Sequence, residues 1–292
     1  MSSSSSSPDG PFVTSEWLYH NLSRVKVVDA SWRFSPDGKT SSFYREFLEE
    51  RIPNARYFDI EKAVREDDDV PHLLPSSAQF AAYVGTNVGA SNEDTLVVYS
   101  RPHLVGAARV WWMFRVFGMP ENQVFILRGG LEDWKKHGYP IASSHDDNSW
   151  MPSETNKTFV AQYQPQFVAD QLLVKEYVQS PRDCVILDAR SSGRFHGTEP
   201  EPRAGVPSGH VDTAINIPFV ELLTQDGQDI LDKEELKQIF QRHGVVDKRN
   251  VICMCGSGVT ATVVHVALQY ALQRSSRVYD GSWMDWTRKH RK

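Results

Sequence analysis

Short apolar runs alternate along the chain with longer segments in which apolar residues recur at helical spacing. Six runs rich in Val, Ile and Leu have the length of buried strands, at 25–28, 96–99, 124–127, 185–187, 251–253 and 277–279. Such runs, separated by helical patterns, are typical of a parallel sheet covered on both faces. The pattern predicts an α/β protein, with a clear helix in the apolar series from Val263 to Ala271.

The same landmarks occur twice in the same order. Asp29 and Asp188 end two of the apolar runs 159 positions apart, and three further pairs of segments match at spacings of 159, 155 and 152: 54–55 with 213–214, 96–100 with 251–255, and 129–134 with 281–286. A period this long suits two copies of one α/β domain better than a solenoid repeat. We therefore predict a duplicated domain whose two sheets are each mostly parallel and flanked by helices.

The duplication suggests how the chain is divided. We expect an N-terminal domain over 11–142 and a C-terminal domain over 165–292, joined by the polar stretch 143–164. Residues 1–10 contain six consecutive serines and no apolar residue after Met1, so we expect a disordered tail there.

Composition excludes several classes of protein. Hydrophobic residues make up 40% of the 292 residues, enough for a sizeable core, and the net charge of −5 leaves no broad basic surface for nucleic acid. No apolar run approaches the ~20 residues that span a bilayer, and the N-terminus has no secretory signal, so we expect no membrane partner. Three cysteines make no disulfide framework, which favours a reducing compartment, with the cytoplasm as default and mitochondria as the alternative. We expect a monomer or a weak dimer.

One cysteine stands where chemistry is expected. Cys255 follows the run 251–253 and opens the turn Gly256-Ser257-Gly258-Val259-Thr260, after which the helical pattern begins. The glycines let backbone N–H groups curl around the sulfur, and the positive end of the helix points to the same place. Such a cradle lowers the pKa of a cysteine from ~8.5 and favours a nucleophilic thiolate. The alternative is a small buried hydrophobe.

Other readings of this loop lack their key residue. A tyrosine phosphatase loop needs Arg six positions after the cysteine, where this chain has Ala261. No Gly-x-Gly-x-x-Gly or Gly-Lys-Thr pattern marks a nucleotide site. Cys253 and Cys255 have no second Cys or His pair for zinc, so we expect neither metal nor organic cofactor. Cys253 and Cys184 are interpreted as structural.

Several motifs together resemble the two-domain rhodanese family, and most closely its members that act on 3-mercaptopyruvate. They are the loop 255–261, the segment 193–203, the ending 280–283 and the helix-like segment 109–115, and the resemblance runs from about Phe12 to Lys289. It implies two tandem rhodanese-like domains with the active site at their interface. The first copy has Ser100 at the position of Cys255, so only the second copy is expected to be active.

The resemblance implies a sulfurtransferase that uses Cys255 for covalent catalysis. The cysteine takes sulfur from 3-mercaptopyruvate as a persulfide, releases pyruvate, and passes the sulfur to thioredoxin, a small thiol or cyanide, with production of hydrogen sulfide. Relatives that prefer thiosulfate carry Arg and Lys directly after the cysteine, whereas Gly256 and Ser257 are uncharged. Two alternatives stay open: a thiosulfate:cyanide sulfurtransferase, and a persulfide carrier for tRNA thiolation or cofactor sulfuration.

The resemblance also implies roles for particular side chains. Ser257 and His72 belong to a proton relay in which Glu61 stands where the family has Asp. Arg194 and Arg203 occupy the positions that bind the substrate's carboxylate and ketone, and their alternative is surface ion pairing with Glu199 or Glu201. The backbone N–H groups of the loop are expected to hold the persulfide anion, through Gly256, Gly258, Val259 and Thr260.

Overall fold

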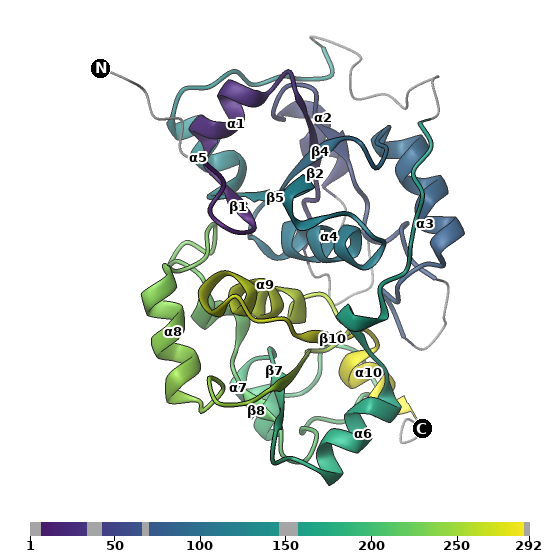
Figure 1. Cartoon of the computed structure of the whole chain (residues 1–292), viewed down its shortest axis with the longest axis vertical. Helices are drawn as coiled ribbons and strands as arrows, with labels where there is room; N and C mark the ends of the chain where they lie inside the picture. Colours follow the sequence, from purple (N-terminus) through teal and green to yellow (C-terminus); the bar gives the residue numbers. More distant parts are fainter. Residues whose placement is uncertain (1–6, 34–42, 66–69, 146–156, 289–292) are drawn as a thin grey trace. The chain divides into compact units, whose positions relative to one another are not determined.

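The computed structural model describes residues 7–33, 43–65, 70–145 and 157–288 (Figure 1). The chain divides into two compact units. The first contains 1–63, 75–163 and 225–229, and the second contains 64–74, 164–224 and 230–292. Most of the predicted Ser-rich tail and the centre of the predicted linker lie outside the described residues.

The first unit is built on a five-stranded parallel sheet. Its strand order is β1-β5-β4-β2-β3, with bounds Phe12–Val13, Val124–Leu127, Thr95–Tyr99, Val25–Asp29 and Arg56–Tyr57. The helices are α1 (Ser15–Asn21), α2 (Tyr44–Glu49), α3 (Ser77–Tyr83), α4 (Val105–Val116) and α5 (Gly130–Lys136), with a π-helical turn at Val84–Val88 and a 3₁₀ turn at Glu121–Gln123. Alternate strand residues such as Val27 and Val97 pack with α1, α2 and α5 on one face.

The second unit repeats this architecture. Its strand order is β6-β10-β9-β7-β8, with bounds Val168–Ala169, Arg277–Tyr279, Asn250–Met254, Cys184–Asp188 and Ile215–Asn216. The helices are α6 (Gln171–Gln179), α7 (Ser192–His196), α8 (Lys233–Arg242), α9 (Ala261–Leu272) and α10 (Ser282–Trp286), with 3₁₀ turns at Pro165–Phe167 and Phe219–Leu222. The α/β class and the duplicated parallel sheet are therefore confirmed.

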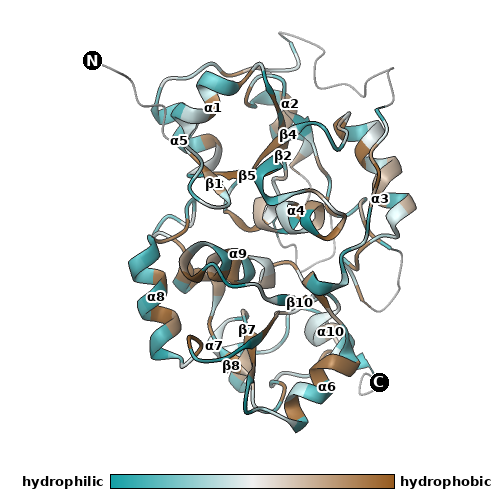
Figure 2. Cartoon of the chain, viewed as in Figure 1, coloured by the Kyte–Doolittle hydropathy of each residue, from teal (hydrophilic) through white to brown (hydrophobic). Residues whose placement is uncertain are grey.

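Helix α8 shows how local sequence signals place an element. Asp232 caps its N-terminus and forms a capping box with Glu235. Leu236, Ile239 and Phe240 form its buried stripe, and a brown strip between teal faces marks this amphipathic character in Figure 2. The helix packs on α9, whose own residues are nearly all buried.

All six predicted strands are present, and the predicted helix after Val263 is α9. The four additional strands β1, β3, β6 and β8 have two residues each, too few for a periodic pattern to show in the sequence. No helix in the described ranges combines the length and the apolar character that a membrane crossing requires.

Two short segments belong to the unit that does not contain their neighbours in sequence. Residues 64–74, which follow β3, are part of the second unit, and residues 225–229 are part of the first. The first exchange matters for the chemistry, because it brings His72 into the unit that contains Cys255.

Candidate active site

The loop between β9 and α9 carries the predicted nucleophile. Cys255 directly follows the last residue of β9 and is only 2% exposed. Its carbonyl accepts a hydrogen bond from Trp283 N at 3.0 Å, and the Gly256 carbonyl accepts one from Met284 N at 2.9 Å. Because a trans peptide points its C=O and N–H in opposite directions, the N–H groups of Gly256 and Ser257 face away from α10. Gly258 then takes a left-handed φ of 77°, which lets the loop turn into α9.

Ser282, at the start of α10, is a site residue that the sequence analysis did not assign. Its Oγ accepts a hydrogen bond from Cys255 N at 3.0 Å and lies 4.0 Å from Cys255 Sγ. The same hydroxyl donates to Tyr279 O at 2.7 Å. Ser282 is fully buried and has a φ of 50°, a region that residues other than Gly rarely occupy. A side chain kept in such a conformation beside a reactive sulfur is typical of a functional position.

The structure brings two predicted relay residues together. His72 Nδ1 lies 2.9 Å from Ser257 Oγ, although the two residues are 185 positions apart. Both side chains are buried, and His72 has a φ of 63°. The contact joins an imidazole to a hydroxyl two residues after the cysteine, an arrangement that can carry a proton.

Residues on the same side of the second unit hold His72 in place. Leu74 N donates to Asp280 Oδ2 at 2.7 Å, and Val70 and Leu73 pack against Met284. Asp280 directly precedes Gly281 and the start of α10, so the segment that carries His72 is attached to the residues around the N-terminus of α10. Asp280 belongs to the ending 280–283, and no role was predicted for it.

Glu61 has a different environment. It belongs to the first unit, and its Oε1 accepts a hydrogen bond from Trp32 Nε1 at 2.7 Å. Its backbone N–H donates to Asp59 Oδ1 at 3.1 Å, and burial raises the pKa of the Asp59 carboxyl. A relay role for Glu61 stays a prediction.

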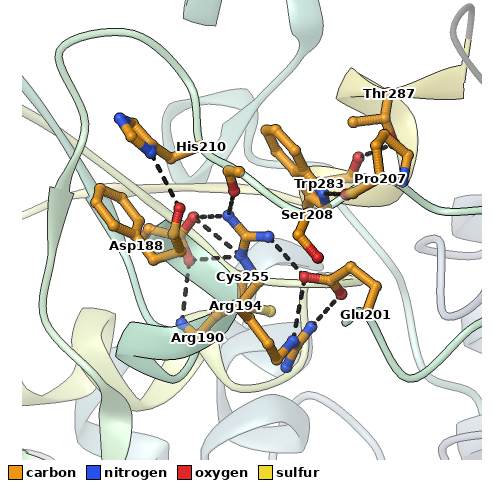
Figure 3. A network of polar contacts seen from close by, with 12 residues as sticks. Asp188, Arg190, Arg194, Glu201, Pro207, Ser208, His210, Cys255, Trp283 and Thr287 are labelled. Carbon is orange, nitrogen blue, oxygen red and sulfur yellow. Dashed lines mark hydrogen bonds and ion pairs between the residues drawn. The ribbon is translucent and has the colours of Figure 1, made fainter. Parts of the chain in front are cut away.

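Arg194, on α7, lies against the cysteine loop (Figure 3). A Cβ added to Gly256 would come within 2.9 Å of Arg194 Nη2, so glycine at this position leaves room for the guanidinium. Arg194 Nε and Nη2 bind the two carboxylate oxygens of Glu201 at 3.1 and 2.6 Å. The ion pair with Glu201, given above as the alternative to substrate binding, therefore forms, and it points the guanidinium at the loop.

Glu201 also connects Arg194 to a buried ion pair. Arg190 Nη1 donates to Glu201 Oε1 at 2.7 Å, while its Nε and Nη2 bind Asp188 at 2.6 to 3.1 Å. Arg190 Nη2 also donates to Gly209 O, and the guanidinium carbon lies 4.5 Å from the ring centroid of Trp283 (Figure 3). Burial raises the pKa of the Asp188 carboxyl, and Arg190 opposes that rise. The two carboxylates and two arginines balance in charge, so the network can be rigid without leaving an uncompensated buried ion.

The other predicted binding residues have less defined surroundings. Val259 is 2% exposed, Gly258 is buried, and Thr260 is half-buried as the N-cap of α9. The loop therefore lies inside the unit with only Gly256 and Thr260 partly open. Arg203 is half-buried in the loop after Glu201. Its binding role stays a prediction.

The other two cysteines, Cys253 and Cys184, are shielded thiols. Burial raises the pKa of the Cys253 thiol to about 12, and its Sγ lies 3.6 Å from Ser276 Oγ. Burial also raises the pKa of the Cys184 thiol. Both remain protonated at neutral pH, which agrees with structural roles for them.

Known proteins resemble this chain over nearly its whole length. The model of the rhodanese-like domain matches residues 14–137 and again residues 172–289. The chain is 37% identical to a 3-mercaptopyruvate sulfurtransferase of Rattus norvegicus, over 94% of this chain and 91% of the relative. It is also 37% identical to a thiosulfate sulfurtransferase of the same organism, over 95% and 92%. Among solved structures, the chain resembles SseA from Escherichia coli, whose structure was presented as one of the 3-mercaptopyruvate sulfotransferases. The TM-score is 0.80 and the identity is 30%, over 94% of this chain and 98% of SseA.

Proposed function

This chain belongs to the rhodanese-like domain family and is a sulfurtransferase of the 3-mercaptopyruvate/thiosulfate type, and on that premise we propose that it prefers 3-mercaptopyruvate as sulfur donor. Cys255 is the nucleophile, Ser257 and His72 move the proton, and Arg194 and Arg203 bind the donor. The observation that carries the proposal is the 2.9 Å contact between His72 and Ser257 beside the cysteine loop.

In the first half-reaction, the thiolate of Cys255 attacks the sulfur of 3-mercaptopyruvate. An S–S bond forms as the C–S bond breaks, and the electron pair of that bond passes to the departing carbon as the enolate of pyruvate. Cys255 becomes a persulfide. Backbone N–H groups of Gly256 and Ser257, turned away from α10, face the developing anion, and each such donor is worth ~3 kcal/mol in comparable anion holes.

The leaving enolate needs a proton on carbon. Ser257 Oγ lies within hydrogen-bond distance of His72 Nδ1, so the hydroxyl can pass a proton to the enolate and recover one from the imidazole. Both groups are buried, which keeps bulk water away from the transfer. Thiosulfate places no such demand, because its leaving group is sulfite and no carbon is protonated.

Arg194 suits a carboxylate donor. A guanidinium has five N–H donors, and Glu201 takes two of those on Arg194 in the described contacts. The donors that remain can bind a second carboxylate next to Gly256, while Glu201 keeps the fork from swinging away. Arg203 would complete the binding of the donor's ketone.

In the second half-reaction, a thiolate attacks the outer sulfur of the persulfide. That sulfur passes to the acceptor and Cys255 leaves as a thiolate, ready for another donor. A second thiol on the acceptor then releases hydrogen sulfide and forms a disulfide. Thioredoxin or a small dithiol meets this requirement, and cyanide accepts the sulfur as thiocyanate.

Identity alone does not select the donor, since the two rat relatives are equally similar to this chain. The cysteine loop distinguishes the two donors. Gly256 and Ser257 bring no cation for a thiosulfate dianion, whereas a hydroxyl paired with an imidazole serves the enolate.

Parallel steady-state assays with 3-mercaptopyruvate and thiosulfate, using one dithiol acceptor, test the proposal. We expect kcat/KM for 3-mercaptopyruvate to exceed that for thiosulfate by at least about tenfold, a transition-state difference of ~1.4 kcal/mol. The Cys255→Ser variant is the blank for both donors. A preference for thiosulfate contradicts the proposal. Turnover with neither donor, while a persulfide on Cys255 is detected by mass, favours a carrier that delivers sulfur to a partner protein.

A further inference from the structure

The first unit has a pocket of about 470 Å³ that the sulfur chemistry does not use. It lies where β2, β3 and β4 begin, and every residue that lines it belongs to that unit: Leu22, Ser23, Arg24, Val25, Lys26, Asn54, Arg56, Asp94 and Lys157. Cys255 follows the carboxyl end of a strand in the other unit. The volume falls within the range of small-molecule sites.

The charges around this pocket are unbalanced. Lys157 Nζ is 2.9 Å from both oxygens of Asp94, and Ser91 donates to the same carboxylate through N and Oγ. Asp94 is thus occupied by Lys157. Within the described ranges, Arg24, Lys26 and Arg56 form no ion pair, so three cations face the pocket without a counterion.

Arg56 provides the second observation. Its Nη1 is buried and has no hydrogen-bond partner in the described part of the chain. A buried donor on a charged group is unfavourable unless something binds it. Lys26 lies on the same face of the sheet, because Arg56 pairs with Val28 and Lys26 is two residues before Val28 on β2. The two cationic side chains therefore lie on one side of the sheet.

The second copy of the domain shows that the fold does not require these cations. At the positions equivalent to Arg24, Lys26 and Arg56, it carries Asp183, Val185 and Ile215. The strand register is the same in both copies, since Val28 pairs with Arg56 as Leu187 pairs with Ile215. The three cations are therefore particular to the first copy, which indicates a function rather than a structural need.

We propose that this pocket binds a small polyvalent oxyanion, with Lys26 and Arg56 as its principal ligands and Arg24 at the rim. No aromatic side chain lines the pocket, so a stacked base is not part of the recognition. The chemistry that fits is a phosphate ester or a compact polycarboxylate, held by charge-assisted hydrogen bonds.

Titration of the ¹⁵N-labelled full chain with inorganic pyrophosphate and, separately, with citrate tests the proposal at constant ionic strength. We expect saturable shifts centred on Arg24, Lys26, Asn54 and Arg56. The double variant Lys26→Val/Arg56→Ile takes its residues from the second copy, and it should weaken binding at least tenfold. Tighter binding of pyrophosphate assigns the phosphate class, and tighter binding of citrate assigns the polycarboxylate class.

The matched control removes two positive charges elsewhere in the same unit. Arg45→Gln/Lys62→Gln alters side chains that are 88% and 75% exposed, and it should leave the affinity within about twofold because the change in long-range charge is the same. Retained sulfurtransferase turnover shows that each variant folds. If the double variant does not fold, Lys26→Val alone replaces it and should weaken binding at least threefold. Binding that is unsaturable, or that the pocket and control variants weaken equally, overturns the proposal.

Discussion

The two copies of the domain share one strand order and one strand register, yet only one of them has a cysteine at the start of a glycine turn. In the second unit, the carbonyls of Cys255 and Gly256 accept hydrogen bonds from α10, so the N–H groups of Gly256 and Ser257 face away from that helix. In the first unit, the loop after β4 is closed by its own side chains. Ser100 Oγ donates to His103 O at 2.6 Å and accepts from Ala107 N at 3.0 Å.

A buried aspartate at the end of the central strand shows the same contrast. The charge of Asp188 is balanced by Arg190, which comes two residues later. The cysteine loop therefore needs no cation of its own to balance this aspartate. In the first copy, Ser31 stands at the position of Arg190, and Arg101 from the loop reaches Asp29 at 3.6 Å. Arg101 is the equivalent of Gly256. In the first copy, the cation that balances the aspartate is thus supplied by the loop itself.

The same backbone thus occurs in both copies, and a few side chains distinguish the two loops. Arg194 approaches Gly256, which has no Cβ, whereas Arg101, at the position of Gly256 in the first copy, lies 3.6 Å from Asp29. Exchanging residues between the copies therefore tests which differences matter.

The largest effect is expected from exchanging the nucleophile. Cys255→Ser should reduce turnover at least ~10³-fold, because the hydroxyl of serine is a far weaker nucleophile than a thiolate. Adding Ser100→Cys to that variant should not restore turnover, since Arg101 and His103 close the loop. Steady-state turnover together with intact-protein mass for a persulfide measures both. Recovery of activity by the added cysteine contradicts the view that the first loop is closed.

The second-largest effect is expected from removing the groups proposed to transfer a proton to the enolate. The first copy has Pro102 at the position of Ser257, so it has no hydroxyl to offer. His72→Asn, a residue that also tolerates positive φ, and Ser257→Ala should each lower kcat with 3-mercaptopyruvate by ~10².

Thiosulfate supplies the control for that prediction. Turnover with thiosulfate should fall less than about fivefold in both variants, because sulfite leaves without protonation of carbon. Equal losses with both donors indicate that His72 and Ser257 only support the loop structurally.

A smaller effect is expected at Ser282 and its equivalent Gly130. Ser282→Ala and Ser282→Gly both remove the hydroxyl beside Cys255, so both should lower kcat by about tenfold. The Gly variant should be more stable than the Ala variant by ~1 kcal/mol, because a φ of 50° favours glycine. Urea unfolding combined with turnover separates the two roles, and equal stability of the two variants refutes the strain argument.

The reciprocal change tests the same point in the first copy. A Cβ on Gly130 would lie 2.7 Å from Ser100 O, and this residue has a φ of 55°. Gly130→Ser should therefore lower the free energy of unfolding by ~2 kcal/mol. No measurable loss of stability means that the first copy could have accepted serine there.

The smallest effect concerns Cys253, whose equivalent in the first copy is Val98. Its folded-state pKa of about 12 is above the ~8.5 of an unfolded cysteine. The unfolded state therefore loses its proton first, so the stabilisation is complete below about pH 8.5 and is lost progressively as the pH rises toward 12.

Cys253→Val removes this titration. Between about pH 8 and pH 10 its stability should fall less than that of the parent chain, by up to ~2 kcal/mol. Thermal unfolding across that range is the measurement, and parallel pH profiles of the two proteins contradict a raised thiol pKa.

Much of this fold was predictable because it rests on local patterns. The six longer strands are continuous apolar runs, and α9 follows its own apolar series, so sequence periodicity located them. Strands of two residues such as β3 and β8 are defined only by their partners. The duplication also aligned Gly130 with Ser282, and a residue with a side chain at the position of a glycine could have identified Ser282 as unusual.

Local sequence was enough to predict the α/β duplication, the cysteine in a glycine turn and the uncharged loop after it. These features depend on residues that are neighbours along the chain. The folded arrangement was needed to place His72 2.9 Å from Ser257, to show Glu201 holding Arg194 against Gly256, and to leave Nη1 of Arg56 without a partner among the described residues. Such contacts depend on how distant segments pack, because hydrogen bonds and ion pairs act over a few ångströms in space and take no account of separation along the chain.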